Sequence, residues 1–295
     1  MNLAKQIYSH TPYDGTFCQD ALNCKFGRHS KSGDDCVKTF CESSLLIVAQ
    51  GLKNITVGQR TYQVGKSQMI LIPVALPVVF HSVQASQSEP FLNIGIKLNP
   101  QKISELALRL YPQGINDVQD NGTGFMTNCD VNIINAVNRL TMCLSNPKEA
   151  QHIAPLILDE IVTRVLLSPI GRQIVQSGFA DSNTKQVIKA ILWLVKNYSQ
   201  PVKVANLAKL AYMSESLFYR SFKVITAMTP LQYQKSLRLY EARRLMIAEC
   251  MDAVTASRLV GYMSESQFSR DYRRLFGNPP KKDVLKLRAQ PLYSF

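Results

Sequence analysis

A twelve-residue segment that occurs twice constrains this chain more than any other feature. Residues Tyr212 to Lys223 read Tyr-Met-Ser-Glu-Ser-Leu-Phe-Tyr-Arg-Ser-Phe-Lys. Fifty residues later, Tyr262 to Arg273 read Tyr-Met-Ser-Glu-Ser-Gln-Phe-Ser-Arg-Asp-Tyr-Arg, with seven of the twelve positions identical. A repeat of this period indicates two copies of one supersecondary unit.

Each copy is typical of the second half of a helix-turn-helix. Ser214 and Ser264 are suited to cap a helix, because a serine oxygen can accept a free backbone N–H of the first turn. A short amphipathic segment precedes each copy, at 203–211 and at 252–260. A helix, a tight turn and a capped helix form the unit whose second helix enters the major groove of DNA. We therefore expect helix-turn-helix units at about 203–224 and about 251–274.

Longer matches around the repeat carry a resemblance to a known family. Residues from about 185 to 283 resemble the DNA-binding domain of the AraC/XylS family of bacterial transcription regulators. The matching positions are Leu207-Ala208, Ser214, Phe218, Arg220, Phe222-Lys223, Thr229 to Tyr233, Arg238 to Met246, Val260 to Tyr262, Phe268 to Arg270 and Phe276 to Pro280.

The chain departs from the family pattern at a few positions. Ala253, Ala256 and Ser257 stand where two isoleucines and an alanine are usual, which predicts looser packing of the second unit. Asp283 replaces a usual tyrosine, and Ala227 replaces a usual glycine.

Arg220 and Arg270 are the strongest candidates for DNA contact. A guanidinium can pair with guanine through two hydrogen bonds or clamp a phosphate. A carboxylate near phosphate is repelled, so Glu215 and Glu265 must meet a cytosine amine, cap their own helices or face away. By position in the family motif the DNA-contacting set is Glu215, Ser216, Tyr219, Arg220, Glu265, Ser266, Gln267, Ser269 and Arg270.

Positive charge is concentrated in the same part of the chain. The net charge is +13; residues 181–295 hold 19 Lys and Arg against 8 Asp and Glu, or +11, and residues 1–180 hold 15 against 13, or +2. A basic region that coincides with the repeat is the electrostatic footprint of a nucleic-acid-binding domain. Double-stranded promoter DNA is therefore the expected partner.

Membrane insertion and secretion are not expected. The N-terminus lacks the apolar core of a signal peptide, and the longest apolar run, 69–80, is short and contains Pro73 and Pro77. Seven cysteines are an odd number in a chain with an adequate core. Free thiols and a cytoplasmic location fit this better than a disulfide framework.

The first half predicts a β-rich domain followed by helices. Residues 1–44 are poorly patterned and predict loops with one strand. Strands are expected at 45–49, 55–57, 60–64, 69–72, 78–83 and 91–96, separated by glycine, asparagine and proline turns. Helices are expected at 102–111, 131–144, 147–167 and 171–178.

The β-rich stretch resembles the cupin-like N-terminal domain of one group of AraC-type regulators, at the Gln50 to Lys53 turn and the Pro73 to Pro77 segment. The resemblance implies a small-molecule effector pocket and a homodimer formed through this half. Apolar stripes from Ile134 to Leu144 and from Ile153 to Leu166 favour core helices, one of which could form the dimer seam.

The expected fold class is therefore α+β with two domains. Residues 1–178 form a cupin-like β-barrel or sandwich with helices, 179–184 a linker, 185–283 an all-α double helix-turn-helix domain, and 284–295 a basic tail. The sequence leaves open whether such a regulator activates or represses transcription. In either case RNA polymerase is an expected further partner.

Catalysis is not expected. The four histidines are dispersed, there is no His-x-His pair, and neither a phosphate-binding glycine loop nor a nucleophile elbow is present. No cofactor and no metal are predicted. Two rivals stay open: a metal-dependent cupin enzyme with a DNA-binding tail, and a ligand-independent DNA-binding protein.

Four early cysteines allow three interpretations. Their spacing does not match zinc ligand pairs two to four residues apart. Neighbouring lysines and an arginine could lower a thiol pKa and create an oxidant sensor. Zinc, sensing and incidental thiols remain open for Cys18, Cys24, Cys36 and Cys41.

Overall fold

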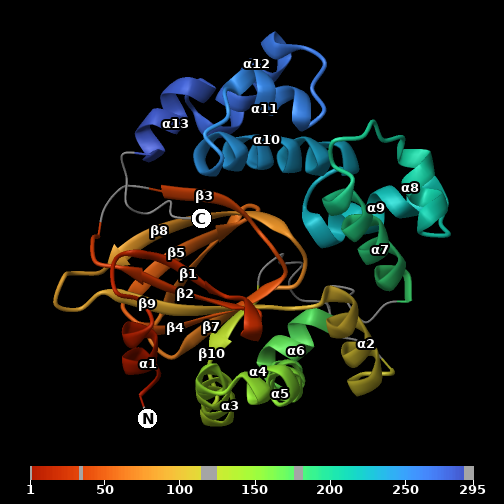
Figure 1. Cartoon of the computed structure of the whole chain (residues 1–295). Helices are drawn as coiled ribbons and strands as arrows, with labels where there is room; N and C mark the ends of the chain where they lie inside the picture. Colours follow the sequence, from red (N-terminus) through yellow and green to blue (C-terminus); the bar gives the residue numbers. More distant parts are fainter. Residues whose placement is uncertain (1, 33–35, 114–124, 176–181, 289–295) are drawn as a thin grey trace.

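Two antiparallel β-sheets build the N-terminal half in the computed structural model, which describes residues 2–32, 36–113, 125–175 and 182–288. The first sheet has six strands in the order β1-β2-β9-β4-β7-β10, and the second has four in the order β3-β8-β5-β6. Figure 1 shows them packed face to face. The strands of the first sheet are β1 (Gly15–Gln19), β2 (Cys24–His29), β9 (Phe91–Lys97), β4 (Ser44–Gln50), β7 (Gln68–Ile72) and β10 (Phe125–Asn128); those of the second are β3 (Cys36–Cys41), β8 (Leu76–Gln84), β5 (Leu52–Val57) and β6 (Arg60–Gly65).

The prediction for residues 1–44 is wrong. The helix α1 (Leu3–Ser9) begins after Asn2, whose side chain accepts from Ala4 N, and it buries Leu3 and Ile7. The strands β1, β2 and β3 and the turn η1 (Asp20–Leu22) follow. Cross-strand pairing of β2 with β9 decides this structure, and such long-range pairing leaves little local pattern in a sequence.

Helices cover the outer face of the six-stranded sheet (Figure 1). The predicted helix at 147–167 is divided in two at Ile153, because Pro155 at the start of the second helix cannot donate a backbone hydrogen bond to the first. Strand β10 was not predicted. The elements of this region are α2 (Pro100–Leu110), α3 (Val131–Met142), η2 (Cys143–Ser145), α4 (Pro147–His152), α5 (Ala154–Leu167) and α6 (Pro169–Ile174).

The C-terminal part is helical and lies against the four-stranded sheet, on the side opposite α3 and α5 (Figure 1). Its helices are α7 (Ser182–Lys196), α8 (Val204–Leu210), α9 (Glu215–Thr226), α10 (Pro230–Ala248), α11 (Ala253–Leu259), α12 (Glu265–Phe276) and α13 (Pro280–Arg288). The predicted basic tail begins inside α13, where Leu287 is buried. Of the predicted linker at 179–184, residues 179–181 lie outside the described residues, and residues 182–184 are not a linker because they form the first turn of α7.

Aromatic packing joins the two halves. The ring of Phe40 on β3 contacts the rings of Tyr233 and Tyr240 on α10, with centroids 5.5 and 5.7 Å apart. Tyr233 Oη also donates to Ala75 O at 2.7 Å, and Lys38 Nζ donates to Leu275 O at 3.1 Å. The long helix α10 is therefore held directly on the β-sheet. Among the helices described, none combines the length and the apolarity needed to span a bilayer.

Candidate nucleic-acid interface

The first helix-turn-helix is formed by α8 and α9. Ser214 caps α9, its Oγ accepting from Leu217 N at 3.4 Å. Phe218 and Phe222, one helical turn apart, are fully buried. Ala227 ends α9 in the left-handed region with φ 57°, the conformation for which the family's glycine is suited.

The second unit, α11 and α12, repeats this arrangement. Asp252 caps α11, and Ser264 caps α12 by accepting from Gln267 N at 3.3 Å. Phe268 and Tyr272 are buried in place of the two phenylalanines of α9. Gly277 takes the position of Ala227, with φ 86°.

The two turns differ by one residue, which the sequence repeat hides. The connection 260–264 is one residue longer than 211–214. Gly261 therefore occupies the left-handed position, with φ 89°, that Tyr212 occupies in the first turn with φ 53°. As a result Tyr212 is 84% exposed, whereas Tyr262 turns inward and its hydroxyl donates to Asp271.

All nine side chains predicted to contact DNA are exposed on α9 and α12. Arg270 donates to Gln267 Oε1 at 3.0 Å, so these two neighbours on α12 form one polar group. Glu265 accepts from Arg258 of α11 at 3.0 Å, which offsets its charge near the face predicted to contact DNA. The predicted residues are brought together as two sets, one on each helix; that they contact DNA stays a prediction.

A network around Asp271 was missed by the sequence reasoning. Asp271 is buried and accepts from Gln267 Nε2 at 3.0 Å and Arg274 at 2.8 Å, and pairs with Lys235 of α10 at 3.1 Å. Burial opposes its ionisation, but these donors hold the pKa of this carboxyl below its ordinary value. The network fixes Gln267, and through it Arg270. Its sequence signal is the four-residue spacing from Gln267 to Asp271, which places both on one helix face.

Arg238 connects the second unit to the loop after α7. It lines a groove of about 430 Å³ between α10 and α12. It donates to the carbonyl oxygens of Tyr198, Ser199, Gln200 and Gly261 at 2.7 to 3.1 Å. The turn of the second unit is thus tied to the loop after α7, and the recognition helices keep a fixed relation through α10.

The early cysteines give no sign of an activated thiolate among those described. Burial raises the pKa of Cys24 to about 12, and burial also raises the pKa of Cys41. Cys18 is exposed. Within the described ranges, no group of three or more histidine, cysteine or acidic side chains could hold a metal ion.

Two helix-turn-helix units mounted on one long helix, and joined to a double-sheet domain, define a DNA-binding regulator. Residues 23–173 match the family described as the AraC-type transcriptional regulator N-terminus, and residues 207–283 match a helix-turn-helix domain family. The chain belongs to the AraC-type transcriptional regulators.

Curated relatives match mainly the C-terminal half. The transcriptional activator RhaS of Pectobacterium carotovorum is 30% identical over 116 residues, which are 39% of this chain and 42% of that protein. The probable transcriptional regulator LumQ of Photobacterium leiognathi is 32% identical over 103 residues, 33% of this chain and 42% of that protein. The match thus spans less than half the length of these relatives.

Structural similarity to a known protein covers more of the chain than these sequence matches do. The structure of ToxT from Vibrio cholerae, solved with a bound unsaturated fatty acid, covers 89% of this chain and 94% of its own, with a TM-score of 0.58 and 13% identity. The predicted two-domain α+β fold is confirmed by this likeness and by the family matches.

Proposed function

We propose that this chain is an effector-responsive transcription regulator that binds promoter DNA in the cytoplasm and reads two adjacent major-groove segments. The supporting observation is that α9 and α12 each carry an exposed arginine and other exposed polar side chains, and that both helices pack on α10. The domain limits of 1–178 and 185–283 are part of this proposal.

We expect α10, on which both units are mounted, to space the two recognition helices. It has 19 residues, which span ~28 Å at ~1.5 Å per residue. Successive major grooves on one face of B-DNA are ~34 Å apart. Once the width of each reading unit is added, the two recognition helices fit neighbouring grooves, about one helical turn apart.

DNA affinity is expected to fall steeply with salt, because the C-terminal part carries most of the positive charge. If about six to ten phosphates are neutralised, affinity falls by roughly 10³ to 10⁵ between about 50 and 200 mM salt. Fluorescence anisotropy with a labelled promoter fragment and the full chain measures this. Affinity that is unchanged by salt contradicts the proposal.

We also propose a homodimer formed through the helical layer of the N-terminal half. Most residues of the two predicted apolar stripes belong to the core; Val137 and Ile161, for example, are buried. Ile153 and Leu156, in contrast, are 45% and 65% exposed. Exposed apolar side chains one helical turn apart are suited to a symmetric contact.

Sedimentation of the full chain at tens of micromolar tests the dimer. Leu156→Glu is expected to convert the dimer to a monomer, because it places a charge in the apolar contact. Tyr13→Glu, a change at another exposed residue, is the control. A wild-type chain that sediments as a monomer rules the proposal out.

A small molecule and RNA polymerase are the remaining proposed partners. ToxT, which shares the fold, was solved with a bound fatty acid, and this supports an effector site in the corresponding domain. A promoter-bound regulator acts through polymerase. Transcription from a target promoter with purified polymerase, with and without the chain, would show activation or repression; no change would exclude a direct action.

A further inference from the structure

Lys53 is buried between the two sheets, and the described residues offer it no counter-charge. Its side chain is 6% exposed, and Nζ lies 4.7 Å from the ring centroid of Phe91 on β9 and 5.2 Å from that of Phe80 on β8. In the part of the chain that the structure describes, Lys53 has these ring contacts but no hydrogen bond or ion pair. Attraction to two rings offsets only part of the cost of removing an ammonium from water.

A second unsatisfied group faces the same place. His29 on β2 is paired with Phe91, and the two rings stack with centroids 6.2 Å apart. His29 is 8% exposed, and its Nδ1 has no hydrogen-bond partner within the described part of the chain. Burial, with the charge of Lys53, lowers the pKa of His29 to about 3, and burial lowers the pKa of Lys53 to about 7. An anion between them would satisfy both groups.

Two inner-face side chains near this point are not fully buried. Asn93 and Leu46 lie on β9 and β4, strands paired on both edges, and strand register places both side chains on the face that carries Phe91. Both are partly buried. The neighbouring inner walls are apolar, formed by Val48, Ile55, Val57, Val64 and Ile70.

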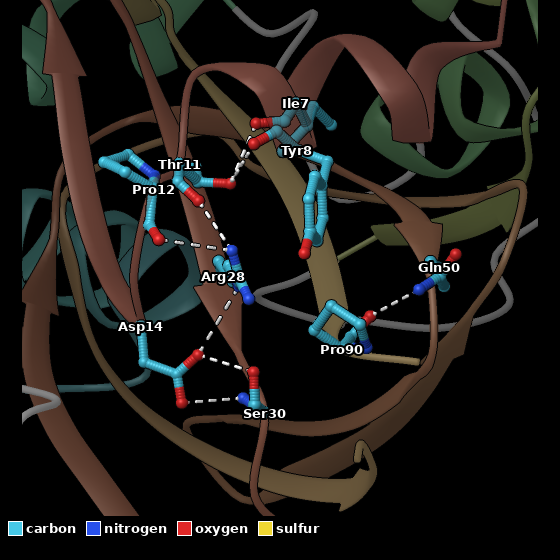
Figure 2. Close-up of polar contacts among 9 residues, drawn as sticks. All are labelled: Ile7, Tyr8, Thr11, Pro12, Asp14, Arg28, Ser30, Gln50 and Pro90. Carbon is cyan, nitrogen blue, oxygen red and sulfur yellow. Dashed lines mark hydrogen bonds and ion pairs between the residues drawn. The ribbon is translucent and has the colours of Figure 1, made fainter. Parts of the chain in front are cut away.

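The chain around Lys53 is tightly fixed. Gln50 Nε2 donates to Pro90 O at 2.9 Å, which holds the β4–β5 turn beside the start of β9 (Figure 2). Gly51 has φ 82°, and a Cβ there would lie 2.7 Å from Gln84 O. These contacts fix the start of strand β5 in a position from which Lys53 reaches the ring of Phe91.

Arg28, the neighbouring cation on β2, has a different role. Figure 2 shows its guanidinium on the other face of the strand, donating to Thr11 O at 3.0 Å and paired with Asp14 at 3.7 Å. It also lies over the ring of Tyr8. Arg28 fixes the N-terminal segment, whereas Lys53 has no acceptor among the residues that the structure describes.

We propose that Lys53 and His29, with Asn93 beside them, receive the carboxylate of a small effector whose apolar body lies between the two sheets. The proposal rests on the effector-responsive function proposed above and specifies the chemical class of the effector. The carboxylate supplies the acceptor that Lys53 lacks, and neutral His29 can donate one N–H to it. The apolar inner walls exclude a strongly hydrated anion such as phosphate.

Calorimetry on the full chain without DNA tests this, with hexanoate and benzoate as probes and hexanamide and benzamide as neutral controls. At about pH 8 most Lys53 is neutral, so a carboxylate must bind together with a proton. We expect uptake of about one proton per bound carboxylate, found by comparing Tris with phosphate buffer. The amides should bind at least about tenfold more weakly.

Lys53→Met should reduce carboxylate binding at least about tenfold and leave the melting temperature equal or higher, since it removes a buried amino group that has no hydrogen-bond partner among the described residues. Exposed Lys66→Met is the matched control and should bind as wild type does. Lys53→Gln serves if the methionine variant does not fold.

Several results would overturn the inference: neither carboxylate binds, the amides bind equally well, wild type takes up no proton, or the Lys53 variants bind unchanged. Because no DNA is present, such a failure leaves the DNA-reading function intact. Loss of salt-dependent DNA binding would instead undermine the function itself.

Discussion

Replacing Arg243 by alanine is expected to destabilise the chain by ~3–5 kcal/mol, because a buried carboxylate would lose its partner. Arg243 on α10 is 6% exposed and binds both oxygens of Asp283 on α13, at 2.8 and 3.2 Å. Tyr272 Oη donates to the same carboxylate at 2.8 Å. Arg243 also donates to Lys38 O on β3 at 3.0 Å, so the pair joins three elements.

Urea unfolding of Arg243→Ala and Arg244→Ala measures this effect. Arg244 is the adjacent residue and pairs with Glu241 and Glu249 at the surface, where its loss should cost less than ~1 kcal/mol. Replacing both partners, Arg243→Met with Asp283→Leu, should cost less than Arg243→Ala alone. Equal midpoints for Arg243→Ala and Arg244→Ala would show that the buried pair does not stabilise the fold.

Gly261→Ala is expected to cost about 3 kcal/mol or more, through backbone strain and a steric clash. Gly261 has φ 89°, and a Cβ there would lie 2.0 Å from Ser199 O. Arg238 holds both carbonyl groups, of Gly261 and of Ser199, so neither can move freely. The second helix-turn-helix should lose its position on α10 together with stability.

Comparison with Gly277→Ala distinguishes the steric clash at Gly261 from its backbone strain. Gly277 has nearly the same φ, 86°, and nothing lies within 4 Å of its added Cβ. The equivalent Ala227 of the first unit already takes a left-handed conformation with φ 57°. Gly277→Ala should therefore cost only about 1 kcal/mol. A thermal melt that shows the same loss for both glycine variants would contradict the clash.

The recognition helices could be predicted because their signals are local. Ser214 and Ser264 cap the helices as expected, and the aromatic pairs at four-residue spacing are buried as expected. The same repeat gave a wrong expectation for the turns that precede these helices. Identical Tyr212 and Tyr262 lie in different environments because the second turn is one residue longer. A one-residue insertion in a turn changes which side chain faces inward and leaves the flanking helices unchanged.

Other features required tertiary structure. Asp283 could be recognised only as a departure from the family, because its partner Arg243 lies forty residues earlier on another helix. The sequence predicted a turn from Gln50 to Lys53, whereas Lys53 lies inside strand β5, and its lack of a partner among the described residues depends on strands β2, β8 and β9. Charge patterns along a chain do not show which cation is paired.

The central claim is that one chain reads two DNA segments through two recognition helices. Footprinting of Arg220→Ala and Arg270→Ala on one operator tests it most directly. Arg220 and Arg270 are equivalent exposed residues of α9 and α12. Each change should weaken specific binding by ~1–3 kcal/mol.

The location of the effect decides between the outcomes. We expect Arg220→Ala to lose protection and base preference in one segment and Arg270→Ala in another, about one helical turn away. If both variants lose protection over the same bases, or if neither changes the footprint, the two helices do not read separate segments and the account is wrong.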